Sequence, residues 1–226
     1  MPLDREKELS GPTSQRRDVR KTLEDARRHG LRDRVFLRHL ERFLRPGRTL
    51  EIGAATGQLA GILREHGHDA VASDIAPKYL EAMAGRGLKA QIVDATRDIV
   101  AQTGERYANI LAQGVIPLIR RDHDTVIATL RAIHDALEER GRLLCISPYA
   151  WRQPDPKAYF SPQEQMQLAR DSGLFEEVTA FPHQVVPPGW YRPWNALLLN
   201  LLDHKLAWVA SVRWVWVMEK RSGRPA

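Results

Sequence analysis

The chain has 226 residues, of which 43% are hydrophobic and 27% are charged, a composition typical of a folded globular protein and not of a disordered or fibrous one. The length is sufficient for one sizeable domain with its own core. A single cysteine, Cys145, excludes an internal disulfide and favours a reducing compartment. Because the first residues lack the apolar stretch of a secretory signal, we expect a cytoplasmic protein.

The net charge of +6 is located in the N-terminal part of the chain. Residues 1–48 contain 14 Lys and Arg against 8 Asp and Glu, whereas residues 49–226 contain 20 of each. A basic segment of this kind can bind nucleic acid or an anionic surface, and it can equally be a solvated helix face. The charge pattern alone is compatible with both.

The first elements predicted along the chain are helical. Apolar residues recur at helical spacing from Val19 to Leu44, and Gly30 within this run is expected to divide it into two helices. Pro46 and Gly47 then form a turn into a short apolar strand over residues 49–52.

A glycine-containing turn follows this strand and carries the strongest functional signal. Gly53 and Gly57 can adopt backbone angles that are closed to other residues, and they let a ligand approach the main chain closely. The helix expected from Gln58 would offer unpaired N–H groups to a polar ligand at its first turn.

The segment from Glu51 to Gly57 resembles motif I of the class I S-adenosylmethionine-dependent methyltransferases. That motif has an acidic residue, any residue and then Gly-x-Gly-x-Gly, and Ala55 takes the place of the middle glycine here. A nicotinamide-binding Gly-x-Gly-x-x-Gly turn would require glycine where the chain has Ala55 and Gln58. The resemblance implies S-adenosyl-L-methionine as cofactor and S-adenosyl-L-homocysteine as product.

The resemblance also implies an α/β fold. We expect a Rossmann-like sheet of seven strands, mostly parallel with an antiparallel last strand, and helices on both faces. Residues 1–48 would form an N-terminal helical cap, and residues 49–226 the methyltransferase domain. An insertion at about 187–210 would lie between the last two strands.

Three further strands, over residues 70–73, 89–93 and 107–112, are expected to end at the same edge of the sheet. Asp74 follows the first of them, about twenty residues after Gly53, the spacing at which a carboxylate accepts both hydroxyls of a ribose. Asp74 could also cap the next helix.

For the remaining strand ends, the resemblance implies contacts with the rest of the cofactor. Asp94 would accept a hydrogen bond from the adenine amino group, unless it only forms a turn. Ile75 and Ala95 would contact the adenine ring. Gln113 would line the site near the methionine portion and the methyl acceptor.

The second half of the chain continues the alternation of helices and strands. An amphipathic helix is expected from Asp124 to Arg140, and a fifth strand over 142–147 contains Cys145 as a core thiol. Ser161 begins a further helix by the capping-box pattern. A sixth strand is expected over 175–186 and the last over 212–219.

The residues that would bind the methyl acceptor are less strongly indicated. Aromatic side chains gather after residue 148, and four of them are candidates for an apolar or aromatic acceptor pocket, although ordinary core packing explains them equally well: Tyr149, Trp151, Trp190 and Tyr191. His183 and His123 are candidates for a general base, and either could be a surface histidine. No residue spacing suggests a metal site.

We therefore expect a methyltransferase that acts by in-line displacement on an O or N atom of a small, apolar or aromatic metabolite, as in natural-product tailoring. One alternative is an RNA methyltransferase that holds its substrate with the basic N-terminal helices. Another is a scaffold that binds the cofactor without catalysis. Charged residues interrupt the apolar segment 196–218, so we expect no transmembrane span, whereas peripheral contact with a bilayer stays compatible with the sequence.

Overall fold

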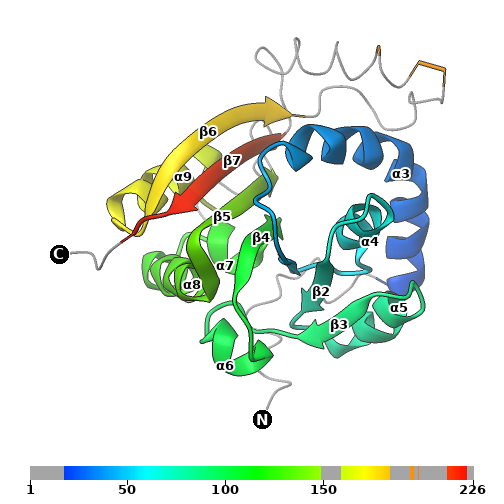
Figure 1. The fold of residues 1–226 in the computed structure, drawn as a ribbon, viewed down its shortest axis with the longest axis horizontal. Coiled ribbons are helices and arrows are strands. Elements are labelled where there is room, and N and C mark those ends of the chain that lie inside the picture. The colour runs from blue at the N-terminus through cyan, green and yellow to red at the C-terminus, as the bar shows by residue number, and fades with distance from the viewer. Residues whose placement is uncertain (1–17, 149–158, 184–193, 196–197, 199–212, 223–226) are drawn as a thin grey trace.

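The computed structural model describes residues 18–148, 159–183, 194–195, 198 and 213–222 (Figure 1). They contain seven strands: β1 (Thr49–Ile52), β2 (Ala70–Asp74), β3 (Lys89–Ile92), β4 (Tyr107–Gln113), β5 (Leu137–Pro148), β6 (Phe175–His183) and β7 (Arg213–Lys220). The strands form one sheet in the order β3-β2-β1-β4-β5-β7-β6. Strand β7 lies antiparallel to both β5 and β6, and the other pairs are parallel, which confirms the predicted mixed sheet.

The described helices connect these strands and lie on both faces of the sheet (Figure 1). They are α3 (Val19–Glu41), α4 (Gln58–Glu65), the 3-10 turn η1 (Pro77–Tyr79), α5 (Leu80–Ala84), α6 (Ile99–Thr103), α7 (Ile116–Ile119), α8 (His123–Ala136) and α9 (Pro162–Asp171). Helix α9 begins with the predicted capping box, in which Ser161 and Glu164 bond to each other's backbone N–H. None of the helices in these described ranges is long and apolar enough to cross a membrane.

Two hydrophobic clusters divide the core according to the alternation of side chains along the strands. On one face, Ile110 and Cys145 pack with residues of α8 and α9. On the other face, the next residues along the same strands, Leu111 and Ile146, pack with residues of α3 and α4. The two-sided burial explains why the central strands are almost continuously apolar.

Helix α3 is one continuous helix, so the prediction that Gly30 divides it was wrong. Gly30 lies where α3 approaches α4, and a Cβ atom at this position would be 3.6 Å from Gln58 Nε2. The Gln58 side chain donates to the carbonyl of Ala26, 3.2 Å away. Tertiary packing against α4 therefore outweighs the modest intrinsic cost of one glycine in a helix.

The boundary between α8 and β5 also differs from the prediction. The helix ends at Ala136, and Leu137 already pairs with Tyr107 of β4. The register then shifts, with Arg140 in the left-handed region at φ 58°. Leu137 fits the apolar stripe of a helix as well as it fits a buried strand end, so periodicity could not locate this boundary.

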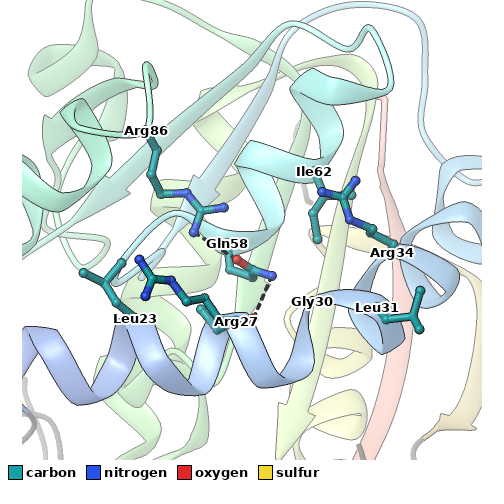
Figure 2. Close-up of a pocket in the computed structure, with 9 residues that line it drawn as sticks. Leu23, Arg27, Gly30, Leu31, Arg34, Gln58, Ile62 and Arg86 are labelled. Carbon is teal, nitrogen blue, oxygen red and sulfur yellow. Dashed lines mark hydrogen bonds between the residues drawn. The ribbon is translucent and has the colours of Figure 1, made fainter. Parts of the chain in front are cut away.

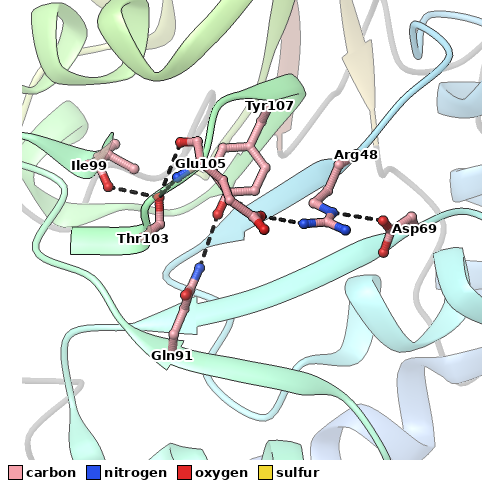
Figure 3. A network of polar contacts seen from close by, with 7 residues as sticks. All are labelled: Arg48, Asp69, Gln91, Ile99, Thr103, Glu105 and Tyr107. Carbon is pink, nitrogen blue, oxygen red and sulfur yellow. Dashed lines mark hydrogen bonds and ion pairs between the residues drawn. The ribbon is translucent and has the colours of Figure 1, made fainter. Parts of the chain in front are cut away.

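At the amino edge of the sheet, Arg48 joins two segments that are distant in sequence (Figure 3). Its Nε donates to Asp69 Oδ2 at 2.7 Å, and its Nη1 donates to Glu105. The Arg48 guanidinium holds the pKa of the Asp69 carboxyl below its usual range. Nearby, Gln91 of β3 donates to the hydroxyl of Tyr107 on β4 at 3.1 Å. This edge therefore serves to hold the strand starts together.

Asn109 is a fully buried polar residue in the middle of the sheet. Its amide oxygen accepts from Arg45 N at 2.8 Å, and its amide nitrogen donates to Arg45 O at 2.9 Å and to Thr49 Oγ1 at 3.2 Å. The side chain thus pairs both backbone groups of Arg45 and attaches the segment between α3 and β1 to β4.

We predict that Asn109→Ala lowers the free energy of unfolding by about 2–3 kcal/mol, because the two backbone groups of Arg45 lose their partners. Urea denaturation followed by circular dichroism measures the change. The control is Gln167→Ala on the exposed face of α9, which should change stability by less than about 0.5 kcal/mol. Equal effects of the two substitutions would contradict this account of Asn109.

Candidate functional site

The carboxyl ends of four parallel strands meet at one edge of the sheet. Ile52 of β1 pairs with Ser73 of β2 and with Ala112 of β4, and Asp74 pairs with Ile92 of β3. The residues that follow these strands are therefore neighbours, although they are distant in sequence. In open α/β sheets this edge is where ligands bind.

The turn after β1 exposes its backbone at this edge. Gly53 is exposed, whereas its neighbours Ile52 and Ala54 are only 1% and 6% exposed. Gly53, Ala55 and Gly57 all have positive φ angles, of 68°, 49° and 69°. Ala55 thus keeps a left-handed conformation that is unusual for a residue with a side chain, and such strain is concentrated at functional sites.

Gly57 is required by packing as well as by its backbone angle. A Cβ atom at this position would be 2.4 Å from Leu88 Cδ1 and 3.3 Å from Met83 Cγ. Helix α4 begins at the next residue, so the glycine allows the helix to start close to β2 and α5. The two glycines of the turn therefore have different roles. Gly53 exposes its main chain at the edge of the sheet, and Gly57 allows α4 to pack closely against its neighbours.

The carboxylate of Asp74 braces the turn. Its Oδ2 accepts from Ala55 N at 2.8 Å, and its Oδ1 accepts from Ala76 N at 2.9 Å. The alternative interpretation of Asp74 as a cap for the next helix does not hold, because η1 begins after Ala76 without a side-chain cap. The carboxylate thus holds the turn from the end of β2, the place where a carboxylate can also accept the hydroxyls of a ribose.

Glu51 is 3% exposed and lies beneath the start of α4. Its Oε2 accepts from Ala60 N at 2.7 Å, and in this way a residue of β1 caps a helix whose own N-cap, Gly57, has no side chain. Burial raises the pKa of Glu51 to about 8, an effect that the bond from Ala60 N opposes and the nearby Asp74 charge reinforces. At neutral pH the carboxyl is therefore mainly protonated.

Asp94 lies two residues beyond β3 and forms a turn. Its Oδ1 accepts from the backbone N of Thr96 at 2.9 Å and from the Thr96 hydroxyl at 2.6 Å. The turn-forming role considered from the sequence is thus present in the structure. Ala95, the next residue, is buried.

The other candidates occupy different positions around the edge. Ile75 and Gln113 are half-buried after β2 and at the end of β4. His123 begins α8 and is exposed, with its Nδ1 3.8 Å from Asp124 Oδ1. His183 ends β6 opposite Arg213. Four candidates lie outside the described residues: Tyr149, Trp151, Trp190 and Tyr191.

Cys145 is buried in the middle of β5, where burial raises the pKa of its thiol far above the usual value. The prediction of a core thiol is confirmed, and a thiolate nucleophile at this position is not available. In the described part of the chain, no group of three or more His, Cys, Asp and Glu side chains is arranged to hold a metal ion.

Sequence reasoning missed two residues that shape the turn. The hydroxyl of Ser73, fully buried, donates to the carbonyl of Glu51 at 2.9 Å and joins β2 to β1 beside the site. Val115 packs against Gly53, where a Cβ atom would be 3.1 Å from Val115 Cγ2. A polar residue directly before Asp74 in an apolar strand was a usable signal for Ser73, whereas nothing local marks Val115.

A seven-stranded sheet of this order, with its antiparallel β7 and a glycine turn after β1, defines the class I methyltransferase architecture. A profile of the methyltransferase domain family matches residues 23–183. The chain belongs to this family, and it is an S-adenosylmethionine-dependent methyltransferase. Comparison with curated protein sequences gives no significant match.

Solved structures with the same fold include several methyltransferases. The TehB-like enzyme from Corynebacterium glutamicum has 19% identity, covers 78% of this chain and 82% of its own, and gives a TM-score of 0.55. The CcbJ methyltransferase from Streptomyces caelestis has 13% identity, coverage of 85% and 90%, and a TM-score of 0.59. The glycopeptide N-methyltransferase MtfA, solved with S-adenosyl-L-homocysteine, has 12% identity, coverage of 81% and 88%, and a TM-score of 0.60. At these identities the likeness concerns the fold.

The burial of Glu51 leads to a prediction about pH. Between its ordinary pKa of 4.5 and about 8, the unfolded chain loses the Glu51 proton and the folded chain keeps it, so stability falls as pH rises through this window. Glu51→Gln keeps an acceptor for Ala60 N and removes this titration. We expect the variant to gain stability relative to the natural chain by up to about 1.4 kcal/mol per pH unit between pH 5 and 8.

Urea denaturation of both proteins across this range measures the difference. Because all other titrating groups are shared by the two proteins, their contributions cancel in the comparison. A stability difference that stays constant from pH 5 to pH 8 would show that Glu51 is already ionised in the folded chain.

Proposed function

We propose that S-adenosyl-L-methionine binds along the carboxyl edge of β1, β2 and β3. The observation that carries this proposal is the exposed main chain of Gly53 between two buried neighbours, with the Asp74 carboxylate bonded to the same turn. An exposed backbone with positive φ angles allows a polar ligand to approach closely, and a carboxylate at the end of β2 can accept a pair of ribose hydroxyls. The residues present therefore suit this cofactor.

In this proposal, each residue of the site has a separate task. The turn of Gly53, Ala55 and Gly57 faces the cofactor with its backbone, and Glu51 supports it from beneath. Asp74 orients the ribose. Asp94, Ile75 and Ala95 contact the adenine, and Gln113 faces the methionine portion and the acceptor.

When bound, the cofactor supplies a methyl group on a sulfonium, which is already a good leaving group. The protein then needs mainly to hold the acceptor atom in line with that methyl. The rigid turn serves this purpose, since Asp74 and Glu51 attach it to β2 and α4. A general base is needed only where the acceptor must lose a proton, and His183 and His123 are the candidates.

We propose a small, apolar or aromatic metabolite as acceptor, methylated on O or N. The support is the aromatic sequence after β5 and in 187–210, with Tyr149, Trp151, Trp190 and Tyr191 as pocket candidates. MtfA, which shares the fold, is a glycopeptide N-methyltransferase. Residues 1–48, which include α3, would act as a cap on the domain formed by residues 49–226.

We predict that Asp74→Asn weakens binding of S-adenosyl-L-homocysteine at least about tenfold, because the charged acceptor for the ribose is lost and one amide NH2 faces a backbone N–H. Isothermal titration calorimetry measures the affinity. The matched control, Asp171→Asn on exposed α9, should bind as the natural chain does. Unchanged affinity in Asp74→Asn would remove Asp74 from the proposed site.

Transfer of labelled methyl groups into host extract tests the acceptor. The extract is separated into small-molecule, lipid and RNA fractions, and Asp74→Asn is run in parallel. We expect label in the small-molecule fraction that is lost in the variant. Label in RNA would instead make the basic N-terminal segment a substrate-binding surface, and cofactor binding without transfer to any fraction would favour a scaffold.

A further inference from the structure

A pocket of about 500 Å³ lies between α3 and α4, outside the carboxyl edge described above (Figure 2). Its volume is within the range of small-molecule sites. Nine residues line it: Leu23, Ala26, Arg27, Gly30, Leu31, Arg34, Gln58, Ile62 and Arg86. None of the nine is acidic, and none is aromatic.

Three arginines from two separate segments meet in this pocket. Arg27 and Arg34 lie two turns apart on the same face of α3, and Arg86 is in the turn between α5 and β3. Figure 2 shows Arg27 and Arg86 on one side of Gln58 and Arg34 on the other. Arg34 also pairs with Glu65 of α4 on the exposed surface, so one of the three positive charges has a protein counter-charge.

The local packing holds the pocket in shape. Arg86 Nη1 donates to Gln58 Oε1 at 2.9 Å, and the guanidinium lies over Gly61, where a Cβ atom would be only 3.0 Å from Nη2. Gln58 also bonds to Ala26 O, so its amide joins α3 to Arg86 across the pocket. A side chain at position 61 would require the Arg86 guanidinium to shift, whereas glycine lets it lie against α4, where the bond to Gln58 holds it before any ligand arrives.

The lining indicates the ligand's chemistry. Positive charges placed close together repel one another, and an anion between them removes that repulsion. The planar guanidinium matches the oxygens of phosphate with paired hydrogen bonds, and Arg27 and Arg86, on the same side of Gln58, offer two such groups. The aliphatic side chains of Leu23, Leu31 and Ile62 line the rest of the pocket and suit an apolar group.

We propose that this pocket binds the phosphoryl group of a small molecule that also carries an apolar moiety. Its small volume and the lack of aromatic residues in its lining do not suit a nucleic acid strand, which needs a groove along its backbone and rings on which bases stack. The pocket is independent of the proposed cofactor site, since the two share no residue. Gln58 directly follows Gly57, so the sites are neighbours across the start of α4.

Calorimetric titration with phenyl phosphate tests this proposal, with benzyl alcohol and inorganic phosphate as probes of the apolar and anionic parts. We expect saturable binding of one phenyl phosphate per chain, weaker binding of inorganic phosphate and none of benzyl alcohol. Arg27→Gln and Arg86→Gln should each weaken phenyl phosphate binding at least about tenfold. Arg131→Gln, an exposed arginine on α8, removes the same charge elsewhere and should leave it unchanged.

Binding of S-adenosyl-L-homocysteine to the same variants separates the two sites. Arg27 is exposed, so Arg27→Gln should retain the fold and the cofactor affinity while losing phenyl phosphate. No saturation up to about 10 mM phenyl phosphate, or equal weakening in Arg131→Gln, would overturn the proposal. The proposal would also be overturned if a single-stranded RNA oligonucleotide bound more tightly than phenyl phosphate and Arg27→Gln abolished that binding, because the arginines would then bind a nucleic acid.

Discussion

The hydrogen bond from Ala60 N to the buried carboxyl of Glu51 is the contact on which the arrangement of the site depends. It attaches the first turn of α4 to β1, the strand that leads into the exposed Gly53. Asp74 completes the attachment from β2 through Ala55 N. Two carboxyl groups on adjacent strands thus position the turn, and the left-handed conformation of Ala55 persists because the surrounding structure holds it.

The sheet divides its two edges between stability and function. At the amino edge, Arg48 with Asp69 and Glu105, and at the core Asn109 with Arg45, connect segments without forming an open site. At the carboxyl edge the main chain of Gly53 is exposed, and Asp74 bonds to the turn that contains it. This division follows from parallel strands, because all their carboxyl ends and following loops are on one side.

Helix α3 extends the catalytic fold on the outer face of α4. Its contacts include Gln58 to Ala26, Arg34 to Glu65, and His66 to Glu41, whose Nδ1 and Oε1 are 2.5 Å apart. These contacts are distributed over the length of both helices and leave the arginine-lined pocket between them. The sequence alone did not indicate a role for the positive charge of the N-terminal segment. In the structure, two of its arginines, Arg27 and Arg34, line this pocket.

Much of the fold could be predicted, because the strands and the glycine turn show in local patterns, and the resemblance carried by that turn implied the mixed seven-stranded sheet. The positions of Gly53, Gly57 and Asp74 were predicted for the same reason. The continuity of α3 through Gly30 and the early end of α8 were predicted wrongly, because contacts with α4 and β4 outweigh local propensity.

The sequence by itself determined the family, the sheet and the residues at its carboxyl edge, since these rest on short motifs and periodicity. Only the tertiary structure decided what those residues contact: Asp74 braces a turn and does not cap a helix, and Glu51 caps α4 and is buried enough to hold a proton at neutral pH. It also decided that Arg27, Arg34 and Arg86 share a pocket. The physical reason is that burial and long-range contacts depend on how distant segments pack, which no local pattern encodes.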